Sequence, residues 1–200
     1  MRDIRTWSGA GALGVPKIEP VESARPCRAM KPVSNDHPLS QLFADHVRES
    51  VAGRRLAGCT EIESYLTDLL VRFVHTDGVF AIRREGEPLN SVIEMLAEGD
   101  VRLNADSFER ERQVHRHIGD YILFWSGVYP DFLRRLRVSG CNDLVCDYTR
   151  QGSHSYYVVS TFDYPPFGEE APTFRRLSEE FEGYTAALAD VAASLPIYAA

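Results

Sequence analysis

Apolar residues recur at intervals of three and four along most of the chain from about residue 37 onward, a pattern that predicts a series of amphipathic helices. The first helix is expected to begin at Asp36 or His37 and to fade near Gly58. Pro38 falls in its first turn, where the missing amide hydrogen is not needed. The face predicted to be buried consists of Leu39, Leu42, Phe43, Val47 and Val51.

A second helix is predicted to start at residues 60–63, Thr-Glu-Ile-Glu, which form a capping box for free backbone N–H groups. It is expected to end before Gly78. Residues 78–87 then form a loop or a brief extended turn, and a short third helix stops at Gly99. The apolar stripe of the second helix is Ile62, Tyr65, Leu66, Leu69, Leu70, Phe73 and Val74.

The stretch from Phe108 to Leu136 is the one around which we expect the fold to be organised. Residues 106–109, Asp-Ser-Phe-Glu, predict an N-terminal cap, and the helix should run to about Gly127 before Pro130 ends it. Its first half is charged and amphipathic. Residues 121–128 are apolar almost all the way round, as expected of a helix buried on every side.

The segment 142–162 is ambiguous, because residues 156–162 are β-branched and aromatic enough to form a strand. We interpret it as a helix, since no partner strand is evident and an isolated strand cannot pair. The last helix has an unbroken seam of steps of three and four. In one domain such a seam favours internal packing over a dimer zipper. Its members are Phe174, Leu177, Phe181, Tyr184, Leu188, Val191 and Leu195.

Residues 1–36 have no sustained periodicity and are interrupted by glycine and proline, so they predict a disordered N-terminal extension. Met30 offers an alternative start of translation. The remainder, residues 37–198, is predicted to be one all-α domain, a bundle of about six helices.

Composition narrows the function only by exclusion. The net charge is −7, of which residues 1–36 contribute +2, so the rest of the chain carries −9. An acidic protein of this kind is not expected to bind nucleic acid or an anionic membrane. No apolar run approaches the ~20 residues that span a bilayer. Four cysteines without a Cys-x-x-Cys pair indicate reduced thiols in the cytoplasm.

Common catalytic motifs are missing from the sequence. No histidine follows a glutamate by three residues, and there is no His-Glu-x-x-His, so no metal site is predicted. Phosphate-binding, dinucleotide-binding and hydrolase motifs are missing as well, and no cofactor is expected. Gly119 and Gly127 are predicted to let another helix approach closely.

One ionisable group, Asp120, lies where the charged half of the organising helix meets the apolar half, with His117 one turn earlier. A carboxylate entering a buried segment must find a partner or take up a proton. One interpretation is an acid/base pair in a pocket. The other, which we favour, is a structural carboxylate bound to an Arg, a Tyr or a helix terminus. A separate cluster, Arg134, Arg135 and Arg137, is a candidate patch for an anion or an acidic partner.

Two spaced motifs, Gly119-Asp120-x-x-Leu123-Phe124-x-x-Gly127-Val128 and Tyr148-x-x-x-Gly152-x-x-x-Tyr156, resemble a pattern in an uncharacterised bacterial family of all-helical proteins. The resemblance covers roughly residues 37–195 and implies a helical domain without implying an activity. It makes Asp120, Gly152 and Tyr156 candidates for one shared internal site.

These observations favour a cytoplasmic, non-catalytic interaction or regulatory protein, with a protein partner or a second copy as its ligand. The alternative is a helical enzyme or small-molecule binder with a buried polar pocket. Its ligand-binding residues would be His117, Asp120, Tyr148 and Tyr156. A closed core around Asp120 would favour the first hypothesis, and an open polar pocket the second.

Overall fold

The computed structural model describes residues 38–56, 60–74, 76–79, 81–89, 91–100, 107–138 and 147–195. The chain divides into two units, Met1–Pro32 and Val33–Ala200, and every described residue belongs to the second. The predicted N-terminal extension, the alternative start at Met30 and the predicted domain limits at residues 37 and 198 therefore lie outside the described residues.

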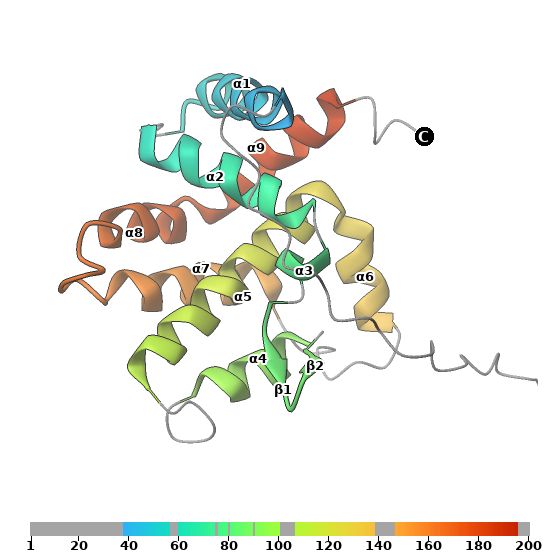
Figure 1. The fold of residues 1–200 in the computed structure, drawn as a ribbon. Helices are drawn as coiled ribbons and strands as arrows, with labels where there is room; N and C mark the ends of the chain where they lie inside the picture. The colour runs from blue at the N-terminus through green and yellow to red at the C-terminus, as the bar shows by residue number, and fades with distance from the viewer. Residues whose placement is uncertain are drawn as a thin grey trace, which may run out of the picture. The chain divides into compact units, whose positions relative to one another are not determined.

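The described residues form helices joined by short connections and one very small hairpin, which confirms the all-α class (Figure 1). The hairpin pairs β1 (Arg83–Arg84) with β2 (Glu87–Pro88) in antiparallel register. The helices are α1 (Pro38–Gly53), α2 (Thr60–Phe73), α3 (Thr76–Val79), α4 (Val92–Gly99), α5 (Phe108–Val128), α6 (Pro130–Val138), α7 (Tyr148–Ser160), α8 (Ala171–Glu179) and α9 (Phe181–Ser194).

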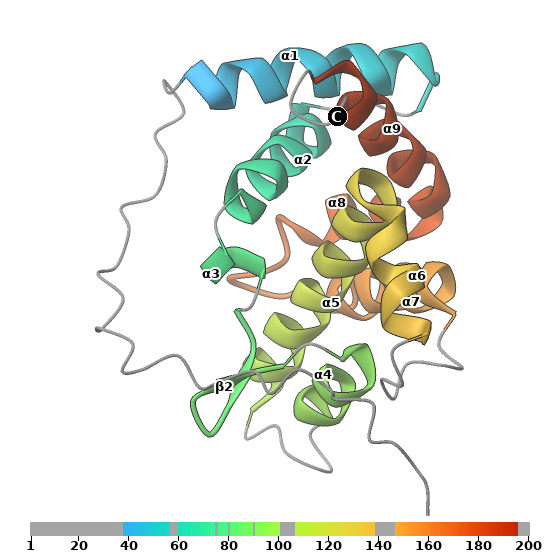
Figure 2. The same cartoon turned by 90° about the vertical axis from the view of Figure 1, so that its right-hand side faces the viewer.

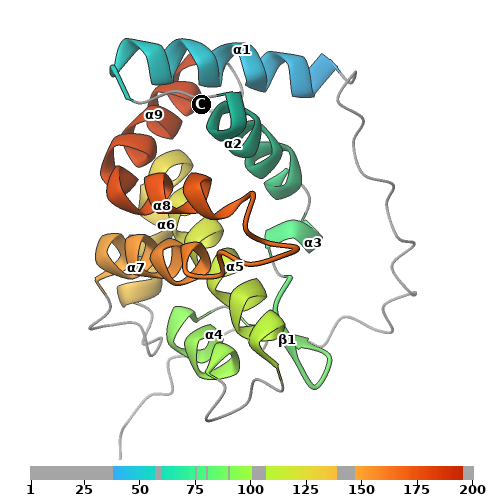
Figure 3. The same cartoon turned by 90° about the vertical axis from the view of Figure 1, so that its left-hand side faces the viewer.

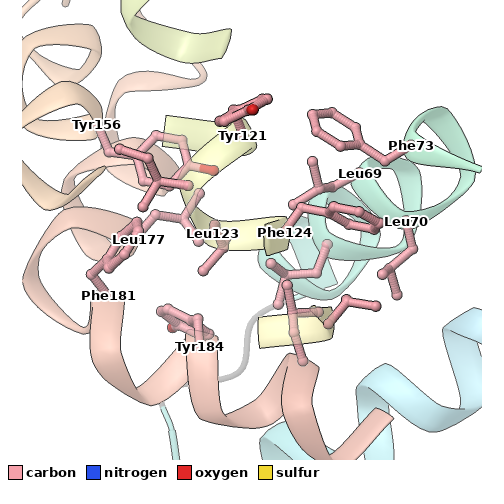
Figure 4. Close-up of a cluster of buried hydrophobic side chains, with 14 of the residues drawn as sticks. Leu69, Leu70, Phe73, Tyr121, Leu123, Phe124, Tyr156, Leu177, Phe181 and Tyr184 are labelled. Atoms are coloured by element: carbon pink, nitrogen blue, oxygen red, sulfur yellow. The ribbon is translucent and has the colours of Figure 1, made fainter. Parts of the chain in front are cut away.

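Helix α5 is the organising helix that the sequence predicts. It packs against α7, α9, α4, α6 and α2, while α1 lies across α2 and α9 (Figures 2 and 3). Residues 121–124, 127 and 128 are buried, and only residues 125 and 126 in this half are partly exposed. Figure 4 shows apolar side chains of α2, α5 and α7–α9 gathered around this helix.

Two glycines of α5 allow the close packing that the sequence predicts. The ring of Tyr156 lies against Gly119, and a Cβ added at Gly127 would lie 2.7 Å from the Cβ of Leu188. Because neither glycine has a side chain, α7 and α9 approach the backbone of α5 directly.

Helix α7 resolves the ambiguity at residues 156–162 in favour of a helix. Asp147 caps it by accepting a hydrogen bond from the backbone N–H of Arg150 at 3.2 Å, and the helix ends at Ser160. Tyr156 and Val159 are buried while Tyr157 is exposed, so the aromatic and β-branched run has a helical arrangement of inward and outward positions.

The predicted last helix is in fact two helices, separated at Glu180, whose φ of −110° and ψ of 27° leave the helical region. The seam is nonetheless buried along its whole length. The break has a physical reason: the two halves pack on different helices, since α8 packs mainly on α7 while α9 packs on α5 and α1. A break lets each half align with its own neighbour.

Other predicted boundaries also need correction. α1 ends at Gly53 rather than near Gly58, because Arg55 adopts a left-handed φ of 54° and its N–H bonds to the carbonyl of Ala52. α2 begins at Thr60 as predicted but ends at Phe73, before the separate turn of α3.

Two further details concern the predicted loop and the organising helix. The segment predicted as a loop or brief extended turn, residues 78–87, includes the end of α3 and most of the hairpin, which extends to Pro88 and has positive φ at Glu85 and Gly86 in its turn. The N-cap of α5 is Ser107, whose hydroxyl accepts from the N–H of Arg110. Pro130 not only ends α5 but starts α6, where proline is well suited to the first helical position.

Candidate functional site: a buried carboxylate beside an arginine–aromatic stack

Asp120 is 1% exposed and both of its carboxylate oxygens are hydrogen-bonded. The phenol of Tyr156 donates to Oδ1 at 2.8 Å, and the phenol of Tyr65 donates to the same oxygen. Arg72 donates from Nη2 to Oδ2 at 3.0 Å. The sequence-based prediction that Asp120 is buried and paired is confirmed.

Three helices position these groups. Tyr65 and Arg72 are seven residues apart, two turns of α2, so they share the face that meets α5. Tyr156 comes from α7, and its ring reaches the carboxylate because Gly119 leaves room for it. Gly119 and Asp120 therefore act together: the missing side chain of the glycine makes room for the phenol of Tyr156, which donates a hydrogen bond to the adjacent carboxylate.

The charges of the cluster balance. Burial raises the pKa of Tyr65 and of Tyr156, and the negative charge of Asp120 raises each further, so both phenols stay protonated donors. Burial lowers the pKa of Arg72 and the charge and hydrogen bond of Asp120 raise it, and the net shift is upward. One carboxylate, one guanidinium and two neutral phenols are therefore expected at neutral pH.

His117 is close to this cluster but is not one of the hydrogen-bond partners described for Asp120. Its ring stacks on Phe73 at 6.1 Å and lies 6.2 Å from the ring of Tyr121. It hydrogen-bonds to the backbone of Val79, and its Nε2 is buried without a partner. Burial lowers its pKa, against the effect of Asp120, so a neutral ring is favoured.

Tyr148 is not brought together with the other predicted ligand-binding residues. It lies eight residues before Tyr156, ~12 Å along α7. It is buried, and it lines a different cavity of about 250 Å³ that Arg134 also lines. Arg134 itself is exposed and forms an ion pair with Asp131 at 3.0 Å. The side chains of Arg135 and Arg137 lie outside the described part of the chain.

Three arginines missed by the sequence analysis alternate with aromatic rings between α5, α2 and α8. We call this set the arginine–aromatic stack, and its order is Phe167, Arg112, Phe174, Arg116, Tyr65 and Arg72. The guanidinium carbons lie 4.1 and 5.7 Å from the flanking ring centroids for Arg112, 5.4 and 5.3 Å for Arg116, and 5.9 Å for Arg72.

The stack joins the Asp120 cluster at Tyr65 and Arg72, so the two features form one polar region. At the other end, Glu170 accepts a hydrogen bond from Nη2 of Arg112 at 2.5 Å. A signal for this arrangement was present in the sequence. Arg112, Arg116 and Asp120 are spaced four apart on α5, which places them on one face.

No cavity opens onto the carboxylate among the three cavities described. The largest, about 770 Å³, lies where α7 begins and α8 meets α9, and Asp120 lines none of the three. Within the described ranges, no three His, Cys, Asp or Glu side chains are grouped to hold a metal ion. No helix in that part of the chain combines the length and apolar composition needed to cross a membrane.

Comparison with known proteins adds no family assignment. No protein-family model, curated protein or solved structure matches this chain.

Proposed function

We propose that the chain is a non-catalytic interaction or regulatory protein of the bacterial cytoplasm, in which Asp120 is a structural clamp. The observation that supports this is the saturation of Asp120, whose two oxygens accept from Tyr65, Tyr156 and Arg72 while its side chain is 1% exposed. A general acid or base has to come within hydrogen-bond reach of its substrate. The carboxylate would have to leave three partners to do so.

The connection between α7 and α8 is the surface that we assign to the partner. Tyr164 is 47% exposed there and is followed by the exposed Pro165 and Pro166. The turn is held in place, since the N–H groups of Phe167 and Gly168 bond to the carbonyl of Tyr164 at 2.8 and 3.0 Å. An exposed tyrosine in a fixed backbone loses little entropy on binding and is typical of interface hot spots.

The neighbouring part of α7 has a similar character. Tyr157 is 43% exposed, and the guanidinium carbon of Arg175 lies 4.5 Å from the centroid of its ring. Tyrosine and arginine are enriched at protein interfaces. Asp163, next to Tyr164, and Glu169, in the same connection, are both exposed, so the partner that fits is a protein whose tyrosine-binding pocket has a basic rim.

A photo-crosslinking experiment tests this function in the cells that produce the protein. A benzophenone amino acid is placed at position 164 and, as a matched control, at position 42, because Leu42 is 40% exposed on α1, a helix that packs on α2 and α9. We expect a discrete crosslinked protein at 164 and none at 42. Capture of a second copy of the chain at position 164 would show that the protein forms a homodimer through this surface.

The affinity of variants for the purified partner then distinguishes an interaction protein from an enzyme or small-molecule binder. Tyr164→Ala is expected to weaken binding by tenfold or more with an unchanged melting temperature, while Leu42→Ala leaves both unchanged. The proposal fails if Tyr164→Ala binds normally. A small molecule that raises the melting temperature of the wild type but not of folded Asp120→Asn would instead support the helical enzyme or small-molecule binder.

A further inference from the structure

Arg116 is a largely buried cation without a hydrogen-bonded carboxylate among the residues that the structure describes. Its side chain is 33% exposed, and its Nε is buried without a hydrogen-bond partner. The carboxylate nearest to it is Glu170, whose Oε2 lies 3.8 Å from Nη1. That same oxygen is hydrogen-bonded to Arg112 at 2.5 Å. Glu170 is thus shared, and Arg112 holds it more closely.

The arginine–aromatic stack has more cations than the carboxylates paired with it. Arg72, Arg112 and Arg116 contribute three positive charges, and their paired carboxylates, Asp120 and Glu170, contribute two negative ones. The residual charge of +1 lies in a part of the chain whose net charge is −9. The rings of Tyr65 and Phe174 attract the guanidinium of Arg116, but neither ring carries a net negative charge, so the residual positive charge remains.

The uncompensated group can be reached from solvent. The side chain of Arg72 is 42% exposed and that of Arg116 is 33% exposed, and both guanidinium groups lie near the ring of Tyr65. Glu170 is 51% exposed and belongs to the connection before α8, where its side chain makes no capping hydrogen bond. An anion arriving from solvent would therefore meet Arg116 beside a carboxylate that is hydrogen-bonded to Arg112 and 3.8 Å from Arg116.

We propose that Arg116, with Arg72 and Arg112 beside it, binds a small oxyanion, a carboxylate or a phosphate, in competition with Glu170. A guanidinium presents parallel N–H donors that match two oxygens of either group. Because Glu170 keeps its hydrogen bond to Arg112, a monoanion bound at Arg116 neutralises the residual charge of the stack. Asp120 is not displaced, because it keeps Tyr65, Tyr156 and Arg72 on its two oxygens.

Titration of the full chain, followed through the ¹⁵N–¹H signals of the arginine Nε groups, tests the proposal. Sodium phosphate and sodium acetate are added separately at constant ionic strength, with sodium chloride as the reference. We expect the Arg116 signal to shift saturably with at least one oxyanion and not with chloride. Saturation by phosphate alone, by acetate alone or by both identifies the oxyanion class. Saturation by neither overturns the proposal.

Variants show whether the binding is at this site. Arg116→Gln is expected to lower the affinity at least tenfold, read from the remaining Arg72 and Arg112 signals. Glu170→Gln is expected to raise it at least threefold, because it removes the competing charge while keeping an oxygen for Arg112. Arg48→Gln is the matched control, an exposed arginine already paired with Asp45 at 3.3 Å, and should leave the affinity unchanged.

The Glu170→Gln variant keeps the test decisive if Arg116→Gln fails to fold. Unchanged or weaker binding in folded Glu170→Gln contradicts the competition and overturns the proposal. An equal loss of affinity in Arg48→Gln and Arg116→Gln would likewise overturn it, because it would indicate non-specific attraction to surface arginines.

Discussion

The ring of Tyr156 lies in the space that any side chain at Gly119 would need: a Cβ there would be 2.6 Å from two carbons of the ring. The ring cannot move aside freely, because its hydroxyl is bound to Asp120 at 2.8 Å and its other neighbours include Phe174 and Phe181. The contact couples the packing of α7 on α5 to the hydrogen bond that satisfies the buried carboxylate.

Gly119→Ala is therefore expected to destabilise the fold by ~1–3 kcal/mol, the usual effect of overpacking a core, although alanine is the better helix former. Urea unfolding measures the change. The matched control is Gly53→Ala, because a Cβ at Gly53 would have no atom within 4 Å. The control should be neutral or slightly stabilising. Equal effects of the two substitutions would contradict the close approach described for Gly119.

Asp120→Asn should lower the free energy of unfolding by ~3–5 kcal/mol, as expected when one partner of a buried ion pair is removed. Arg72 would then lack its carboxylate, and the two phenols would donate to a neutral amide. Tyr156→Phe, which removes one hydrogen bond to a charged group, should lower it by ~1.5–3 kcal/mol. Chemical denaturation of both variants checks this order. A stable Asp120→Asn protein would mean that the carboxylate is kept for function at the expense of stability.

Stability is expected to fall as the pH drops from 6.5 to about 4, in part because of His115. Burial, followed by the effect of His154, lowers its pKa from 6.5 to about 4, against an opposing effect of Asp100. In this window the unfolded chain binds a proton that the folded chain does not, so acid favours unfolding. The slope from this one group is at most ~1.4 kcal/mol per pH unit.

His115→Gln should reduce that slope without abolishing it, because burial lowers the pKa of His117 in the same sense. Urea unfolding at several pH values between 4.5 and 7 measures the slope for the two proteins. An identical slope in the wild type and in the variant would show that His115 is protonated in the folded state as readily as in the unfolded one.

Phe181→Ala should lower the free energy of unfolding by ~3–5 kcal/mol, since the ring is 3% exposed and lies against Gly152. Sedimentation should give the same molecular mass for the wild type and the variant, because the seam packs within the chain. Leu42→Ala, at a position 40% exposed, is the control and should change stability by less than ~0.5 kcal/mol. A lower association constant with unchanged monomer stability would point to a dimer zipper instead.

The burial of Asp120 could be predicted from the sequence, because the residue lies at the start of an apolar helical segment that has to be buried. The sequence could not show which arginine and which tyrosines bind it. Tyr65 belongs to the apolar stripe of α2, because its ring packs against Tyr156 and Phe174, and only its hydroxyl is polar. Tyr65 and Arg72 precede Asp120 by 55 and 48 residues, and no local pattern specifies a contact at that distance.

The buried seam of the last two helices was equally predictable, but the break at Glu180 was not. A stripe with steps of three and four is preserved across a single non-helical residue, so periodicity alone does not report it. The candidate cluster of Arg134, Arg135 and Arg137 stays a prediction, because the side chains of the last two lie outside the described part of the chain. The grouping of arginines from α2 and α5 around aromatic rings is separate from it and involves residues distant in sequence.

The hydrogen bonds of Asp120 also constrain how the chain can be divided. They join residues 36 to 55 positions apart, from α2 through α5 to α7, so a cut anywhere between Tyr65 and Tyr156 leaves a fragment without part of the set. A fragment ending after α5 would bury the carboxylate without the phenol of Tyr156, and one starting at α5 would lack Arg72. Split-protein reporters and domain insertions are therefore best placed outside this interval and away from the connection that we assign to the partner.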